Sequence, residues 1–140
     1  MLTSSFTLPV NATPEKIWPY YADMSLRSVW EKDLEAISLE GDFVTHTKGV
    51  MKLKGMPTLT FTLTHVEENR SFWDETIVAG LGTICFGHEI IYENNQTCIR
   101  QTVTFRNEKG EIEQKDIEFF KQLIEDTPDA LFLIKRAVEN

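Results

Sequence analysis

Hydrophobic and polar residues alternate with a period of two over much of the chain, which predicts β-strands. The alternation begins with Phe6, Leu8 and Val10, and it resumes between about residues 35 and 106 in a long run without helical periodicity. Turn-forming residues divide this run into six predicted strands, with breaks at residues 40–42, 54–57, 68–71, 80–82 and 94–95.

Two short helices are predicted between the first strand and this run. Thr13 is a suitable N-cap and Pro14 a suitable first helical residue, while Pro19 removes a backbone hydrogen bond and keeps the first helix short or bent. The second helix is expected to begin at the cap residue Ser25. Its expected core-facing residues are Leu26, Val29 and Trp30.

The last segment has the apolar stripe of an amphipathic helix, with alternating spacings of three and four residues. The stripe consists of Ile117, Phe120, Ile124, Thr127, Leu131, Ile134 and Val138. Pro128 interrupts it and Thr127 could cap a new helix, so we expect a kink or break between two helical pieces. The stripe predicts a core helix packed on the sheet, in preference to a helix that binds a membrane or a partner.

These elements predict an α+β protein in which a curved antiparallel sheet wraps around a long C-terminal helix. All 140 residues are expected to form one domain, because no linker or repeat divides the chain. A sheet that grips a single helix usually leaves an internal cavity, and such cavities bind small molecules.

The turn at Asn94 and Asn95 defines the register of one hairpin, because asparagine tolerates the positive φ angles of a two-residue turn. Ile84 should then face Phe105, and Glu89 should face Arg100 on the opposite side of the sheet. The same register separates Cys85 and Cys98 along the hairpin, beyond the reach of a disulfide.

This register also places His88 opposite Gln101 on the apolar face of the hairpin. Each polar side chain must bond the other, a water molecule or a ligand, because an unpaired buried polar group costs about 1–3 kcal/mol. The pair is therefore either a self-satisfied structural pair or the polar anchor of an apolar pocket. An imidazole can also act as an acid or base, so His88 is the candidate catalytic residue.

Composition and motifs exclude several other functions. The formal net charge of −8 opposes nucleic-acid binding, and no apolar run is long enough for a membrane span. The N-terminal residues lack the features of a signal peptide, which predicts a cytoplasmic protein. The three histidines lie in different predicted strands, and no nucleotide-binding or hydrolase motif is present, so we expect neither a metal nor a cofactor. Asp74 or Glu75 could supply a pocket carboxylate, but the turn near Asn69 permits two registers.

Three segments carry a resemblance to a known family. They are Val10–Trp18 with Trp30 downstream, Phe86–Ile90, and Thr127–Leu131. Together they resemble the SRPBCC, or START-like, superfamily, and most closely its bacterial members of the polyketide cyclase/dehydrase type. The resemblance covers essentially the whole chain and implies the helix-grip fold, with the element order β-α-α-β6-α.

The sequence favours binding of a small hydrophobic or aromatic molecule between the sheet and the C-terminal helix, by a monomer or a homodimer. The resemblance leaves two alternatives open: an enzyme of the cyclase or dehydratase kind that uses His88, and an interaction module related to chaperone activators. The interaction module predicts a collapsed cavity and an exposed apolar patch. The predicted ligand-binding residues are Trp30, Met51, Leu53, Phe61, Leu63, Phe86, His88, Gln101, Val103, Phe120 and Ile124.

Overall fold

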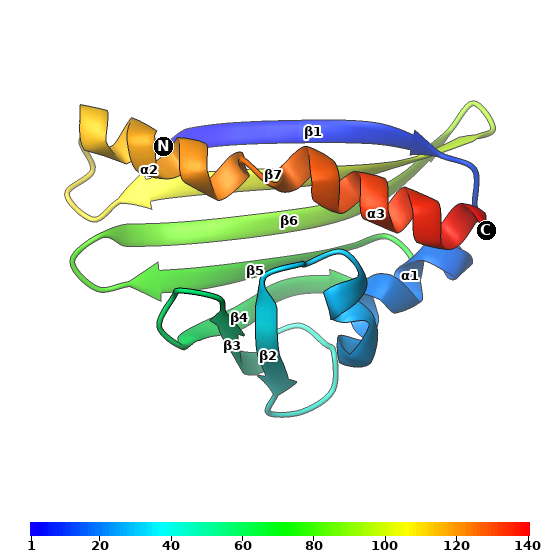
Figure 1. The fold of residues 1–140 in the computed structure, drawn as a ribbon, viewed down its shortest axis with the longest axis horizontal. Coiled ribbons are helices and arrows are strands. Elements are labelled where there is room, and N and C mark those ends of the chain that lie inside the picture. The colour runs from blue at the N-terminus through cyan, green and yellow to red at the C-terminus, as the bar shows by residue number, and fades with distance from the viewer.

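A computed structural model describes all of residues 1–140, and its element order is the one predicted (Figure 1). A strand and two short helices precede six strands, and a helical segment in two pieces ends the chain. The elements are β1 (Leu2–Val10), α1 (Pro14–Ala22), the 3-10 helix η1 (Met24–Val29), β2 (Leu34–Leu39), β3 (Lys48–Leu53), β4 (Leu59–Glu67), β5 (Ser71–Val78), β6 (Gly82–Glu93), β7 (Gln96–Asn107), α2 (Gln114–Ile124) and α3 (Thr127–Glu139).

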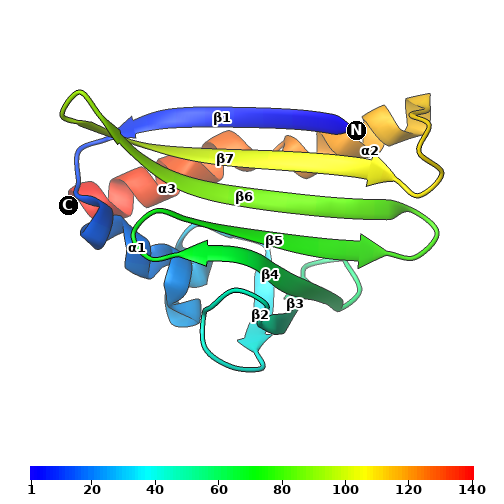
Figure 2. The same cartoon turned by 180° about the vertical axis from the view of Figure 1, so that it is seen from behind.

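The seven strands form one antiparallel sheet in the order β1-β7-β6-β5-β4-β3-β2. Helices α2 and α3 lie across one face of this sheet, and the view from behind shows the long strands uncovered on the other face (Figure 2). Consecutive strands pair as neighbours from β2 to β7, while β1 closes the far edge against β7. This arrangement is the predicted helix-grip fold. None of its helices is both long and apolar enough to cross a membrane.

The hairpin of β6 and β7 has the predicted register throughout. Asn94 and Asn95 have φ angles of 53° and 62°, as a primed two-residue turn requires. On the uncovered face, Glu89 accepts two hydrogen bonds from Arg100, with N···O distances of 2.9 and 3.0 Å. Cys85 and Cys98 are both free thiols and pair with Thr104 and Ile91 rather than with each other.

The face of the sheet that the helices cover is called the gripping face. The core lies between this face and the helices. Most of the predicted C-terminal stripe is buried there, although Ile117 is 40% exposed and was wrongly included. The buried apolar side chains form two clusters. The larger contains Val10, Ile17, Trp18, Tyr21, Trp30, Phe61, Leu63, Phe72, Ile90, Ile99, Leu131, Ile134 and Val138, and the smaller contains Ile84, Val103, Phe105 and Phe120.

The predicted helix starts are only partly correct. Thr13 caps α1 as expected, since its hydroxyl accepts a hydrogen bond from the backbone N–H of Lys16. Asp23, and not Ser25, caps η1, because the Asp23 carboxylate accepts from the backbone N–H of Ser25. A carboxylate two residues earlier satisfies a free N–H group of the first turn equally well.

The burial of η1 also differs from the prediction, because Arg27 is buried while Val29 is 37% exposed. The C-terminal break occurs as predicted, between α2 and α3, but Asp126 rather than Thr127 is the residue that precedes α3. The Asp126 side chain makes no capping hydrogen bond at the start of α3.

The period of two is not continuous along the sheet. The register shifts between Leu34 and Ala36 on β2, and again between Leu63 and His65 on β4. Such irregularities insert a residue into one strand and increase the local bend and twist. The shift on β4 lies next to the turn at Asn69, where the sequence permitted two registers.

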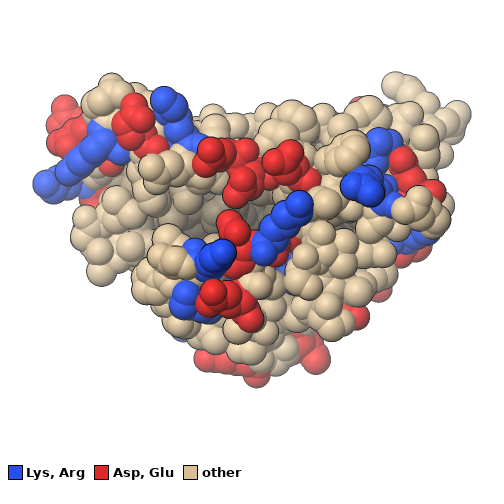
Figure 3. All heavy atoms as spheres, in the orientation of Figure 1, with Lys and Arg blue, Asp and Glu red and all other residues tan.

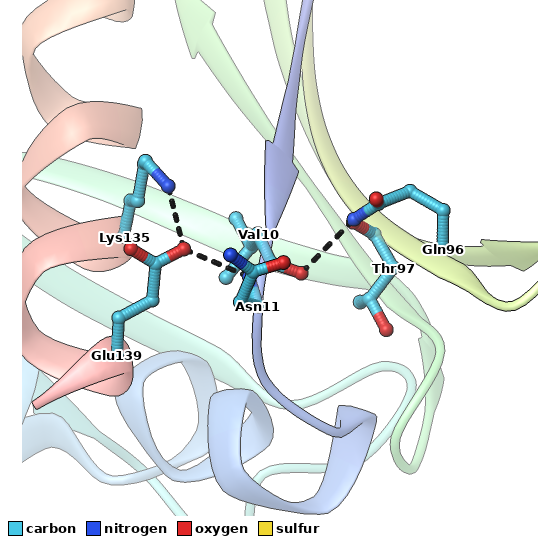
Figure 4. Close-up of polar contacts among 6 residues, drawn as sticks. All are labelled: Val10, Asn11, Gln96, Thr97, Lys135 and Glu139. Carbon is cyan, nitrogen blue, oxygen red and sulfur yellow. Dashed lines mark hydrogen bonds and ion pairs between the residues drawn. The ribbon is translucent and has the colours of Figure 1, made fainter.

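Hydrogen bonds join the last helix and strand β7 to the end of β1 (Figure 4). The Glu139 carboxylate of α3 accepts a hydrogen bond from the backbone N–H of Asn11, at 2.8 Å, and pairs with Lys135. On the other side of β1, the Gln96 amide donates to the carbonyl oxygens of Val10 and Thr97. The last turn of α3 is therefore fastened to the segment that connects β1 to α1.

Gly87 lies on the uncovered face of the sheet, where the Trp73 ring leaves no room for a side chain. A Cβ atom at Gly87 would lie 2.3 Å from an atom of the Trp73 ring on β5. We expect Gly87→Ala to lower the free energy of unfolding, measured by urea denaturation, by about 1–3 kcal/mol. Gly41→Ala is the matched control, because nothing lies within 4 Å of its Cβ position. Equal losses in the two variants would contradict this packing.

Candidate functional site

A cavity of about 430 Å³ lies between the gripping face of the sheet and the two C-terminal helices. Its opening is in the region where the space-filling view shows a hollow flanked by charged side chains (Figure 3). The walls come from the end of η1 and the loop after it, the β3–β4 connection, strands β6 and β7, and the break between α2 and α3. The cavity has the size and the mixed apolar and polar lining of small-molecule sites.

Four of the predicted ligand-binding residues line this cavity: Trp30, Leu53, Phe86 and Gln101. The other seven lie outside its lining. Phe61 and Leu63 belong to the larger core cluster, Met51 packs against it, and His88 stacks on its Phe72. Val103 and Phe120 belong to the smaller cluster, and Ile124 packs against it.

The wall has one buried polar atom without a partner, the side-chain carbonyl oxygen of Gln101. Gln101 is 8% exposed and projects from β7 into the cavity lining. His88 is its direct cross-strand neighbour, as predicted. The Gln101 oxygen nevertheless has no hydrogen bond to His88 or to any other group, so the self-satisfied pair is not formed through this oxygen.

His88 is packed as an aromatic ring of the core. It is 2% exposed and stacks on Phe72, with ring centroids 4.3 Å apart and planes inclined by 12°. Tyr21 and Trp30 contact it at centroid distances of 5.5 and 5.2 Å. Burial, aided by the positive charge of Arg27, lowers the pKa of His88 well below 6.5, which keeps the ring neutral near pH 7.

A group of charged side chains lies behind the cavity wall. Arg27 of η1 donates a hydrogen bond to Glu31 at 2.9 Å, and its guanidinium carbon lies 4.6 Å from the ring centroid of Trp30. Asp74 of β5 is the inward-facing residue of the pair whose orientation the sequence left open. Burial raises the pKa of Asp74 to about 7, although Arg27 opposes this rise.

The sequence prediction missed a second apolar row on the C-terminal helices. Phe119, Leu123 and Leu133 line the cavity, whereas the predicted stripe passes beside them into the core. The signal was present, because an apolar face wider than one stripe indicates that a helix contacts more than the sheet beneath it. The remaining lining residues that the sequence did not predict are Glu31, Lys32, Asp33, Lys54, Met56, Gln122, Asp126, Thr127, Asp129 and Ala130.

A larger hollow of about 830 Å³ lies at the other end of the sheet, near the contacts of Figure 4. It is lined by the β1–α1 connection, the β4–β5 turn and the β6–β7 hairpin, mostly through polar residues of these loops. Open, polar surfaces of this kind are weaker candidates for a binding site than a cavity roofed by helices. No three His, Cys, Asp or Glu side chains lie together in an arrangement that could hold a metal ion.

Known structures share this fold. The chain is similar to protein MLL2253 from Mesorhizobium loti (10% identity, TM-score 0.77) over 99% of this chain and 97% of that one. It is also similar to the Aha1 dimer from Colwellia psychrerythraea (17% identity, TM-score 0.73), again over 99% and 97%. Norcoclaurine synthase from Thalictrum flavum matches at 14% identity and a TM-score of 0.71, over 99% and 87%.

At these identities the solved structures show the fold alone. No curated protein matches the sequence. The sequence of residues 1–130 matches the model of one protein family, which is described as polyketide cyclase / dehydrase and lipid transport. The chain therefore belongs to this family, within the SRPBCC superfamily.

Proposed function

We propose that this protein binds a small, mainly apolar or aromatic molecule in the cavity between the sheet and helices α2 and α3. The observation that carries the proposal is the Gln101 carbonyl oxygen, which is buried in the wall of a cavity of about 430 Å³ without a partner. Buried polar atoms are usually paired, and a ligand that donates a hydrogen bond would pair this one.

The apolar walls support the same function. Trp30 and Phe86 line the cavity on the side of η1 and the sheet, while Phe119, Leu123 and Leu133 line it from the helices. Burying the apolar surface of a ligand against these side chains stabilises the complex by roughly 25 cal/mol per Å² before the entropic cost of association.

The two alternatives receive less support. A ligand-free interaction module predicts a collapsed cavity, whereas this cavity has room for a small molecule. Acid–base catalysis by His88 needs a titratable ring within reach of a substrate, whereas His88 is stacked in the core, has a strongly lowered pKa and lies outside the cavity lining.

Filling the cavity tests the proposal. Ala130 lines the cavity from α3, so Ala130→Phe should place a ring inside it and weaken the binding of N-phenyl-1-naphthylamine, a fluorescent apolar probe, by about tenfold or more. Ala137→Phe is the matched control, because Ala137 lies on the same helix outside the lining. Probe fluorescence that never rises with the unmodified protein, or that rises equally with both variants, would refute the proposal.

A further inference from the structure

We infer that the molecule bound in this cavity has an apolar body and a head group that donates a hydrogen bond and is neutral or positively charged, such as a hydroxyl or an ammonium group, and that carboxylates are rejected. This inference rests on the proposed function and specifies the chemical class of its ligand. Two independent features support it: the unpaired atom in the wall and the charges at the opening.

The unpaired atom is an acceptor. The carbonyl oxygen of Gln101 is buried in the wall and can be satisfied only by a donor that enters the cavity. A carboxylate has only acceptor oxygens, so it could bond only the Nε2 of the same amide and would leave the carbonyl oxygen unpaired. A hydroxyl or an ammonium group supplies the missing proton.

The charged residues at the opening are mostly acidic. Acidic side chains outnumber basic ones in the lining by four to two, and by three to two without Glu31, whose charge Arg27 pairs. The acidic residues are Glu31, Asp33, Asp126 and Asp129, and the basic residues are Lys32 and Lys54. The charges around the hollow in Figure 3 are accordingly dominated by carboxylates. An anion that enters therefore meets a net repulsion, and a cation meets a net attraction.

The helix dipoles do not reverse this preference. The N-terminal end of α3, which has a partial positive charge, faces the cavity through Thr127 and Ala130. The C-terminal end of α2, with the opposite partial charge, faces it through Gln122 and Leu123. Because the two ends meet at the same break, their fields largely cancel, and the side-chain carboxylates determine the sign of the potential.

The test compares head groups on one apolar body. Decanol, decylamine, decanoate and methyl decyl ether are each used to displace N-phenyl-1-naphthylamine from the protein at about pH 8, where the carboxylate is ionised. We expect decanol and decylamine to displace the probe at concentrations at least about tenfold lower than decanoate. The ether accepts but does not donate a hydrogen bond, and it should be weaker than decanol because of Gln101.

Two variants separate the two features. Gln101→Leu should weaken decanol binding about fivefold more than it weakens ether binding, because only the donor loses its partner. Asp126→Asn combined with Asp129→Asn should improve decanoate binding about fivefold relative to decanol binding. Asp126 makes no side-chain capping bond to α3, so its replacement leaves the start of the helix in place.

The outcomes distinguish this inference from the proposed function. If the probe binds and Ala130→Phe blocks it, but decanoate binds as well as decanol or the ether binds best, the ligand class is wrong while the binding function stands. Equal weakening of decanol and ether by Gln101→Leu would overturn the role of the carbonyl oxygen. If no probe binds, both the function and the ligand class are refuted.

Discussion

Asp74→Asn is expected to raise the free energy of unfolding near pH 8 by up to about 4 kcal/mol, because asparagine replaces a carboxyl that must ionise inside the core. Asp74 is 5% exposed, and burial raises its pKa from 3.8 to about 7. The negative charge of Glu31 adds to this rise, and the positive charge of Arg27 reduces it. Asparagine has nearly the same shape and stays neutral.

The pH dependence of the effect follows from the raised pKa. The unfolded chain releases the Asp74 proton above pH 3.8, whereas the folded protein holds it up to about pH 7. The stability from this group is therefore fully present below pH 3.8 and is lost as the pH rises to about 7, at about 1.4 kcal/mol per pH unit.

His88 opposes this trend in the wild-type protein. Its pKa is lowered well below 6.5 in the folded state, so the unfolded chain takes up a proton first as the pH falls below 6.5. Stability from His88 is thus lost toward acid pH, while stability from Asp74 is lost toward neutral pH. Just below pH 6.5 the two slopes are therefore opposite and largely cancel.

Urea denaturation at several pH values between about 5 and 8 measures these slopes. Asp74→Asn should expose the His88 slope, with stability falling toward acid pH, and His88→Gln should expose the Asp74 slope, with stability falling toward neutral pH. If the profile of Asp74→Asn ran parallel to that of the wild-type protein over the whole range, the raised pKa of Asp74 would be wrong.

The hairpin of β6 and β7 shows why much of the fold could be predicted from the sequence. Asparagine at positions 94 and 95 indicates a turn that fixes the register, and the alternation on both strands independently requires the same register. A slip of one residue would have placed Ile84 and Phe105 on opposite faces of the sheet, and Glu89 and Arg100 likewise. Two independent constraints with one solution made the His88–Gln101 row predictable.

The buried charges could not be predicted in the same way. Arginine is rarely buried, so the apolar pattern assigned Val29 to the core and did not include Arg27. The structure reverses them because the aromatic rings of Trp30 and Phe72 lie beneath the guanidinium, and Glu31 pairs with it. The contact with Phe72 joins residues far apart in the chain, and the pattern of apolar positions records neither this contact nor the local ones with Trp30 and Glu31.

The sequence did not determine whether Asp74 or Glu75 faces inward, and the physical reason is different. The irregularity between Leu63 and His65 adds a residue to β4, which changes the relation between the β4–β5 turn and the pairing beyond it. The position of the cavity between the sheet and the last helices was predicted, but the helical residues that line it were not. Phe119, Leu123 and Leu133 lie one row beside the predicted stripe. An apolar stripe shows which side of a helix faces the sheet, but it does not show how wide a face the helix buries.

Arg27→Leu is expected to lower the free energy of unfolding by about 3 kcal/mol, because it breaks an ion pair that is mostly removed from water. The Arg27 side chain is 6% exposed and that of Glu31 is 22% exposed. Without the guanidinium, the Glu31 carboxylate has no partner. The loss lies at the lower end of the range for buried pairs, since Glu31 still reaches water at the cavity opening.

A double-mutant cycle separates the ion pair from the loss of packing. Arg27→Leu combined with Glu31→Leu should recover most of the loss, because both charges are then absent and two apolar side chains adjoin Trp30. The matched control is the exposed pair Glu118 and Lys121 on α2, where Lys121→Leu should change stability by less than about 1 kcal/mol. If Arg27→Leu had as little effect as Lys121→Leu in urea denaturation, the buried pair would contribute nothing to the wall behind the cavity. If the double variant lost as much as Arg27→Leu alone, the loss would come from the contacts of Arg27 with the aromatic rings rather than from the unpaired carboxylate.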